Sequence, residues 1–114
     1  MDKNLIRDWA SEADVAAEFY HQIRLRETFT VYLEVPLPSQ HHRSRSFRAD
    51  AVVCKDDKAV CAIEFKRDHK EATIRGRQAS AYEDLGMPYM VCNGRKAIPG
   101  VVEELHKRFS EALQ

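Results

Sequence analysis

Two apolar segments that each carry one acidic residue constrain this chain more than any other feature. Residues 48–53 read RADAVV, residues 62–66 read AIEFK, and a turn separates them. Both segments have the apolar and β-branched composition of strands. A charged side chain in the middle of such a strand is costly to bury unless it binds a metal ion or pairs with another charge. Asp50, Glu64 and Lys66 are therefore the first candidates for chemistry.

The register of a hairpin between the two strands decides whether the acids meet. A three-residue loop, residues 56–58, would close the hairpin symmetrically around Asp57 and place Asp50 opposite Glu64. Lys66 then points the same way as Glu64. The other cross-strand pairs expected in this register are Val52 with Ala62 and Cys54 with Val60. The opposite face is wholly apolar and consists of Ala51, Val53, Cys61, Ile63 and Phe65.

Two adjacent carboxylates repel each other and raise the pKa of one of them, and a divalent metal ion between them relieves the repulsion. The pattern thus predicts a metal site at Asp50 and Glu64 with Lys66 beside it. A register slip of one residue would separate the acids. The alternative interpretation is an ordinary hairpin with a solvated face and a cross-strand Lys–Glu pair.

Composition indicates one globular domain over residues 1–114, since 44% of the residues are hydrophobic and 32% are charged. The formal net charge is zero, so binding of a polyanion must depend on a local cluster of cations. Residues 40–48 contain Arg43, Arg45 and Arg48 and no acid, which makes these arginines candidates for contacts with phosphates. Solubility alone is the alternative role. The adjacent His41 and His42 are interpreted as solvated, because neighbouring side chains in an extended chain point apart.

The three cysteines lie in expected strands and show no C-x-x-C spacing, so we expect buried free thiols and no zinc site. No secretion signal and no membrane span are apparent. The expected compartment is the cytoplasm, either of a bacterial cell or of a host cell infected by a phage.

Periodicity predicts the remaining elements. A helix should begin at Ser11, where the sequence has the form of a capping box, and should end near residue 26. A strand over residues 29–35, a polar loop over residues 39–46 and the hairpin follow. A helical stripe of Ile74, Gln78, Tyr82 and Leu85 ends at Gly86, and a strand over residues 88–92 comes next. An amphipathic helix with apolar residues at 101, 102, 105, 109 and 113 closes the chain. The helical crossover requires a parallel strand pair, so the sheet should be mixed.

This order, with Asp50, then Glu64-Phe65-Lys66, then Gln78 and Tyr82 on the next helix, resembles the PD-(D/E)xK nuclease superfamily. The resemblance covers nearly the whole chain and is closest to small VRR-NUC and Holliday-junction-resolvase-like members. It implies an α/β fold of the restriction-endonuclease type, in which an α-β-β-β-α-β core with a mixed central sheet is flanked by helices. Here an extra C-terminal helix follows that core. Ala49 stands where many members have proline.

The resemblance also implies roles for individual residues. Asp50, Glu64 and the carbonyl of Phe65 would hold Mg²⁺ or Mn²⁺, which suits a hard cation that keeps several waters. Lys66 would orient or deprotonate the attacking water. Gln78 would position Lys66 or a phosphate, and one turn later Tyr82 would support it or contact the nucleic acid. The alternative role for Tyr82 is core packing.

The superfamily also uses a glutamate on its first helix, and this chain offers two. Glu12 lies on the same stripe as Val15 and Phe19, whereas Glu18 is turned away from it, so we expect Glu12 to face the sheet. A favourable interaction with the helix dipole is an alternative role for Glu12.

The resulting hypothesis is a magnesium-dependent DNA endonuclease that hydrolyses phosphodiesters. We expect it to act as a homodimer on branched or flap DNA, as in repair and recombination. One alternative is a non-catalytic domain of the same fold that binds nucleic acid or a protein. Another is a subunit that depends on a separate recognition protein.

Overall fold

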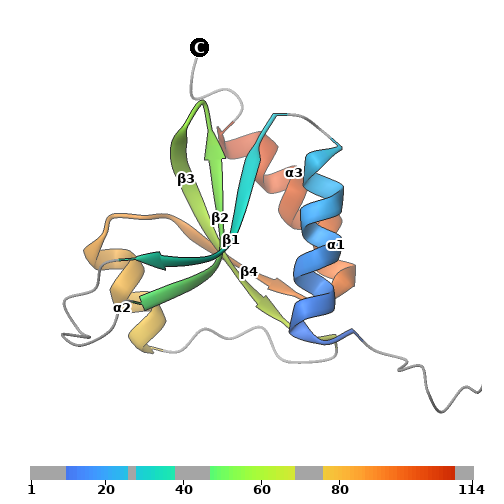
Figure 1. Ribbon diagram of the computed structural model, residues 1–114, viewed down its shortest axis with the longest axis horizontal. Helices are drawn as coiled ribbons and strands as arrows, with labels where there is room; N and C mark the ends of the chain where they lie inside the picture. The colour runs from blue at the N-terminus through green and yellow to red at the C-terminus, as the bar shows by residue number, and fades with distance from the viewer. Residues whose placement is uncertain (1–9, 26–27, 38–46, 69–75, 110–114) are drawn as a thin grey trace, which may run out of the picture.

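The computed structural model describes residues 10–25, 28–37, 47–68 and 76–109, and for residues 47 and 76–78 it describes the backbone only. The elements follow one another in the predicted order (Figure 1). They are α1 (Glu12–Arg24), β1 (Thr30–Leu37), β2 (Phe47–Lys55), β3 (Lys58–Lys66), α2 (Gly76–Asp84), β4 (Tyr89–Asn93), the 3₁₀ helix η2 (Arg95–Ala97) and α3 (Ile98–Phe109). The expected loop at residues 39–46 lies outside the described residues.

The four strands form one mixed sheet in the order β1-β2-β3-β4. β1 pairs antiparallel with β2, and β2 pairs antiparallel with β3. β4 pairs parallel with β3 after the helical crossover, so the predicted mixed α/β sheet is confirmed. The parallel pairs run from Ala62 with Tyr89 to Lys66 with Asn93.

The turn of the hairpin differs from the predicted three-residue loop. Asp56 and Asp57 both have positive φ values, 50° and 66°, as the two central residues of a type I′ turn do. Cys54 therefore pairs with Ala59, and not with Val60, which is the extra residue of a β-bulge. The backbone twist of this two-residue turn matches that of the strands, and the bulge restores the predicted register from Val53 onward.

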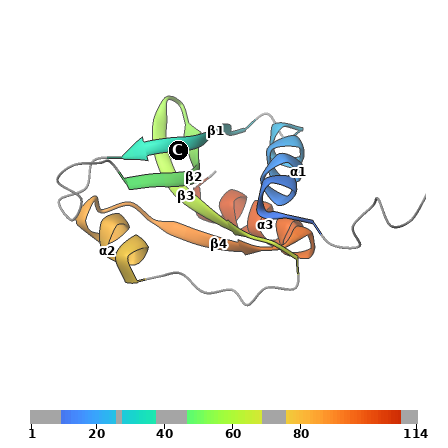
Figure 2. The same ribbon diagram turned by 60° about the horizontal axis from the view of Figure 1, so that its bottom comes forward.

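Helices cover both faces of the sheet (Figures 1 and 2). α1 and α3 pack on the face that was predicted to be wholly apolar, and α2 packs on the other face. The first core cluster includes Val15, Phe19 and Ile23 of α1 and Ile98, Val102 and Leu105 of α3. The second cluster is smaller and includes Ala81 and Tyr82 of α2. Leu85, which was predicted to share a helical stripe with Tyr82, lies just after the end of α2 at Asp84 and is 36% exposed.

Helix α1 begins where its capping box predicts. Ser11 is the N-cap, its hydroxyl accepts the backbone N–H of Asp14, and the Asp14 carboxylate accepts the backbone N–H of Ser11. Asp68, which lies just after β3, connects this end of the helix to the sheet by hydrogen bonds. Its carboxylate accepts the N–H of Ala10 at 2.8 Å and three hydrogen bonds from Arg95, which hold the pKa of Asp68 well below its usual range.

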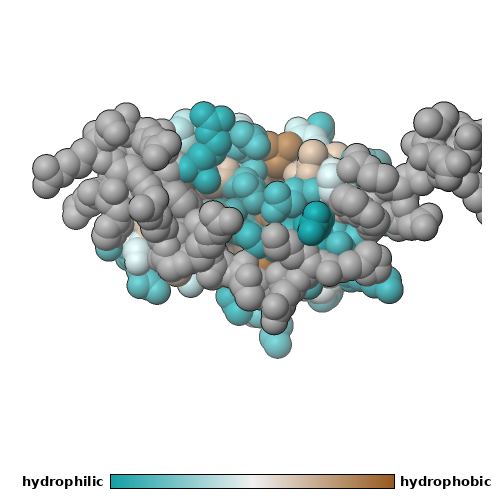
Figure 3. Space-filling view, turned by 90° about the horizontal axis from the view of Figure 1, so that it is seen from below, coloured by the Kyte–Doolittle hydropathy of each residue, from teal (hydrophilic) through white to brown (hydrophobic). Residues whose placement is uncertain are grey.

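The thiols behave largely as predicted. All three cysteines are free; Cys61 and Cys92 are buried and Cys54 is half-buried. Burial raises the pKa of Cys61 and of Cys92 to about 12, so both remain protonated and unreactive at neutral pH. Among the described residues, no helix is long and apolar enough to cross a membrane. The face seen from below is mostly hydrophilic where described side chains are visible, with a small hydrophobic area among them (Figure 3).

Candidate metal and catalytic site

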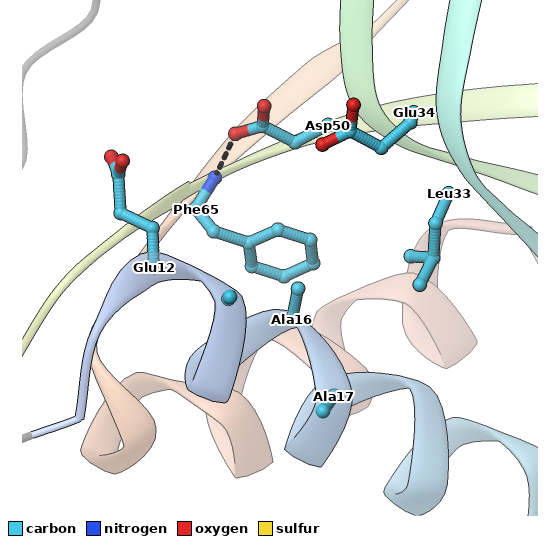
Figure 4. A pocket seen from close by; sticks show the side chains of 8 residues that line it. Glu12, Ala16, Ala17, Leu33, Glu34, Asp50 and Phe65 are labelled. Atoms are coloured by element: carbon cyan, nitrogen blue, oxygen red, sulfur yellow. Dashed lines mark hydrogen bonds between the residues drawn. The ribbon is translucent and has the colours of Figure 1, made fainter.

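Asp50 lies on β2 at the point where the pairing with β3 ends. The last registered pair is Ala51 with Ile63, and beyond it the backbone N–H of Phe65 donates to Asp50 Oδ2 at 2.8 Å (Figure 4). The Asp50 side chain thus accepts a backbone hydrogen bond from β3 at a position where the backbone of β2 is no longer paired with β3. Because the N–H and C=O of a strand residue point to the same side, the Phe65 carbonyl also lies on the side of β2.

Glu64 is the one charged residue that is buried among the described residues, with an exposed fraction of 1%. Its carboxyl group accepts a hydrogen bond from the Tyr82 hydroxyl and is hydrogen-bonded to Asp50. The register of β3 thus brings the two predicted acids together. Desolvation, and then the contact with Asp50, raise the pKa of Glu64 to about 8. The Tyr82 hydrogen bond and the charge of Lys66 act in the opposite direction.

Lys66 is the last residue of β3 and is half-buried. Its backbone carbonyl accepts the N–H of Gly94 at 2.9 Å, which ties the ends of β3 and β4 together. Side chains alternate along the strand, so Lys66 shares a face with Glu64 and with Ala62, which packs in the α2 cluster. The positive charge of Lys66 lowers the pKa of Glu64, as a nearby ammonium does for a carboxyl group.

A cleft of about 250 Å³ opens between the start of α1 and the β1–β2 strands (Figure 4). Its lining consists of Glu12, Ala13, Ala16, Ala17, Leu33, Glu34, Asp50 and Phe65. Glu12 lines this cleft together with Asp50, as predicted for the acid of the first helix. Glu18 is not part of the lining, and its Oε1 accepts a hydrogen bond from Gln22 at 3.1 Å. Of the two glutamates, Glu12 is therefore the one that lies in the same cleft as Asp50.

Glu34 is an acid of this cleft that the sequence analysis missed. It lies on β1, where the pairing with β2 skips from Leu33–Ala51 to Val35–Ala49, and its φ is 55°. The irregular backbone directs its carboxylate toward Asp50 in Figure 4. An acid between apolar residues of a predicted strand, the same signal that marked Asp50 and Glu64, could have identified it.

The predicted nucleic-acid contacts have different outcomes. Arg48 is exposed and lies 3.4 Å from the carboxylate of Glu34, an ion pair of two exposed groups that contributes little to stability. Arg43, Arg45 and the side chain of Gln78 lie outside the described residues. Tyr82 is fully buried and stacks on Tyr89, with ring centroids 5.1 Å apart. A buried side chain cannot contact a nucleic acid as predicted, and the Tyr82 hydroxyl instead donates a hydrogen bond to Glu64.

The donors at the site fit a hard divalent cation. Two carboxylates and a carbonyl oxygen, with the remaining positions taken by water, suit Mg²⁺ better than an ion that prefers nitrogen or sulfur. Within the described ranges, no three His, Cys, Asp or Glu side chains converge as a group able to hold a metal ion.

Comparisons of the chain with models of protein families, with curated proteins and with solved structures give no match.

Proposed function

We propose that this protein is a metal-dependent DNA endonuclease of the PD-(D/E)xK type. One observation carries the proposal: Asp50 contacts a buried Glu64 at the position where β2 leaves β3. Two carboxyl groups in contact destabilise the folded chain unless one holds a proton or a cation lies between them. A site that is costly to the fold and rich in oxygen donors is best explained by binding of a cation.

Mg²⁺ or Mn²⁺ would be held by Asp50, Glu64 and the Phe65 carbonyl. When bound, the ion would polarise the phosphodiester and lower the pKa of the attacking water. Lys66, on the same face as Glu64, would orient that water and offset the negative charge that develops on the phosphoryl oxygens. The water oxygen forms the new bond to phosphorus as the bond to the leaving alkoxide breaks. Glu12 at the mouth of the cleft would accept hydrogen bonds from ordered water.

The choice of DNA as substrate rests on the arginines of residues 43–48 and on the resemblance to branched-DNA nucleases. The chain has no net charge, so affinity for a polyanion would depend on this cluster and would fall steeply with salt. A second copy of the chain would double the surface available to enclose a duplex or a junction, which is why a homodimer is part of the proposal.

A second candidate function is a non-catalytic or partner-dependent domain of the same fold that binds nucleic acid or a protein. The observation that favours it is the enclosure of Glu64, which is 1% exposed and already accepts a hydrogen bond from Tyr82. Under this alternative the carboxyl pair would be a structural remnant, and Glu64 would stay protonated by sharing its proton with Asp50.

Cleavage assays with a matched pair of variants test the proposal. The purified chain is incubated with supercoiled plasmid and with labelled linear, flap and four-way-junction DNAs, in Mg²⁺, Mn²⁺ or EDTA. Glu64→Gln removes the proposed ligand, and Glu103→Gln, at an exposed position on α3, is the control. Cutting that needs metal, is lost in Glu64→Gln and is kept in Glu103→Gln supports the nuclease. Intact DNA under all conditions would instead support the second candidate function.

A further inference from the structure

Asn93, the last residue of β4, has a buried oxygen that lacks a hydrogen bond. Its Oδ1 is inaccessible to solvent and finds no donor among the described residues. Buried side-chain oxygens nearly always have a donor, so one without a partner indicates a missing interaction. Because Cys92 packs in the α1–α3 core and Tyr89 packs on the α2 face, alternation places Asn93 on the α2 face. This is the face of Glu64.

The nearest cation by register is Lys66. It pairs with Asn93 in the parallel β3–β4 ladder, and the Gly94 N–H bond to the Lys66 carbonyl fixes this register. Neighbouring strands lie about 4.8 Å apart, so a flexible four-carbon stem on the same face can bring its ammonium to the amide. An ammonium has three donors and no acceptor, which complements a lone buried acceptor.

We propose that Asn93 is a positioning residue in the metal-loaded protein, where it accepts a hydrogen bond from Lys66 that the metal-free structure does not contain and holds the ammonium beside the carboxyl pair. The inference rests on the proposed function, in which Lys66 orients the attacking water. Without an anchor on β4, the ammonium is drawn directly onto Asp50 and Glu64, where it would compete with the metal ion for the same oxygens. Asn93 gives it a second, neutral partner on the opposite side.

NMR of the lysine ammonium groups tests the contact without any cleavage. The ordering of the Lys66 ammonium is compared in the wild type, in Asn93→Leu, which removes the acceptor, and in Asn93→Asp, which keeps one. Lys58, exposed at the other end of β3, serves as the internal reference. We expect Lys66 to be more ordered than Lys58 in the Mg²⁺-loaded wild type, to lose this order in Asn93→Leu and to regain it in Asn93→Asp.

Other outcomes overturn the proposal. A Lys66 as mobile as Lys58 in the wild type, or unaffected by Asn93→Leu, would show that Asn93 does not hold it. Loss of order in both Asn93 variants would show that Asn93 only packs. Should Asn93→Leu fail to fold, the contact is tested by changing Lys66 instead. Lys66→Met should shift the side-chain carbonyl resonance of Asn93, and the control Lys58→Met should leave that resonance unchanged. An unchanged resonance in Lys66→Met contradicts the proposal.

Kinetics connect the contact to the reaction. Asn93→Leu should lower kcat for DNA cleavage by about tenfold to a hundredfold with KM retained, because a misplaced ammonium costs rate and not binding. In a Lys66→Met background the same change should add no further loss. Additive losses would overturn the role in catalysis. If the chain cleaves no DNA at all, the proposed function fails, while the NMR comparison still decides whether Asn93 holds Lys66.

Discussion

The hydroxyl of Tyr82, on α2, donates a hydrogen bond to the carboxyl group of Glu64, on β3, and both side chains are buried. This contact connects the smaller core to the candidate site. Burial and the proximity of Glu64 raise the pKa of Tyr82 above its usual value, so the phenol stays protonated and remains a donor. The hydrogen bond also lowers the pKa of Glu64 relative to burial alone.

Tyr82→Phe should therefore destabilise the protein and make Glu64 harder to ionise. The ring can keep its stacking on Tyr89, while the buried carboxyl loses a donor, so the free energy of unfolding should fall by about 1–3 kcal/mol. Urea unfolding measures this loss. Tyr20→Phe is the matched control, because the Tyr20 hydroxyl accepts an exposed hydrogen bond from Arg24 at 3.3 Å. Equal losses in the two variants would mean that the Tyr82 hydroxyl has no special role.

Glu64→Gln should stabilise the metal-free protein, increasingly so at high pH. The ordinary pKa of Glu64, 4.5, applies to the unfolded chain, and the folded value is about 8. The folded state thus binds the proton more tightly, so the stability from this group is complete below the unfolded pKa and is lost as the pH rises to the folded one. Glutamine keeps an acceptor for Tyr82 and does not ionise.

Urea unfolding in EDTA at about pH 5 and about pH 9 tests this expectation. The gain from Glu64→Gln over the wild type should be larger at the higher pH by a few kcal/mol at most. Glu34→Gln, at an exposed acid of the adjacent cleft, should show no comparable difference between the two pH values. A gain that is the same at both pH values would contradict the raised pKa of Glu64.

Local sequence patterns were sufficient to predict much of this fold. The capping box at Ser11 marks the start of α1, and alternation over residues 51–65 separates the apolar face from the face that carries Glu64. Asp50 and Glu64 could be paired from the sequence because a symmetric register is the only one that makes both acids face one site.

Features that depend on backbone irregularity or on distant contacts could not be predicted. The positive φ values of Asp56 and Asp57 and the bulge at Val60 compensate each other, so the register survives although the turn was predicted wrongly. Glu34 could be identified as an acid within a strand, but its direction into the cleft depends on a left-handed backbone that alternation does not anticipate. The hydrogen bond from the Ala10 N–H to the Asp68 carboxylate joins residues that are 58 positions apart, and no local sequence pattern predicts it.

Substitutions at three glycines distinguish the effect of backbone strain from that of steric contact. Gly94 has a φ of 80°, and an added Cβ would lie 2.9 Å from Asp68 Oδ1 and 3.1 Å from Asp68 Cα. Gly86 has a φ of 64° with no atom within 4 Å of that position, and Gly100 lies in α3 with open space and no positive φ. Each substitution by alanine therefore tests a different cost.

Gly94→Ala should be the most destabilising, by about 2–4 kcal/mol, since it combines left-handed strain with displacement of Asp68. Gly86→Ala should cost about 1–2 kcal/mol from strain alone. Gly100→Ala should stabilise by up to about 1 kcal/mol, because alanine favours the helix. Thermal and urea unfolding rank the three variants. A Gly94→Ala no worse than Gly86→Ala would show that Asp68 moves aside without cost.

Binding of Mg²⁺ should release a proton from Glu64 and therefore depend on pH. In the metal-free protein the pKa of Glu64 is raised to about 8 by burial and by its contact with Asp50. A carboxylate must lose its proton to bind the ion, so below this pKa the affinity should rise by about tenfold per pH unit and should level off above it.

Calorimetry in buffers of different ionisation enthalpy counts the protons released, which should approach one per ion at about pH 6. Glu103→Gln, the exposed α3 variant, should leave the profile unchanged, whereas Tyr82→Phe should move its plateau to higher pH, because the phenol lowers the pKa of Glu64. Affinity that does not change between about pH 6 and about pH 8 would mean that the ion binds without Glu64, and the proposed metal site at Asp50 and Glu64 would then be wrong.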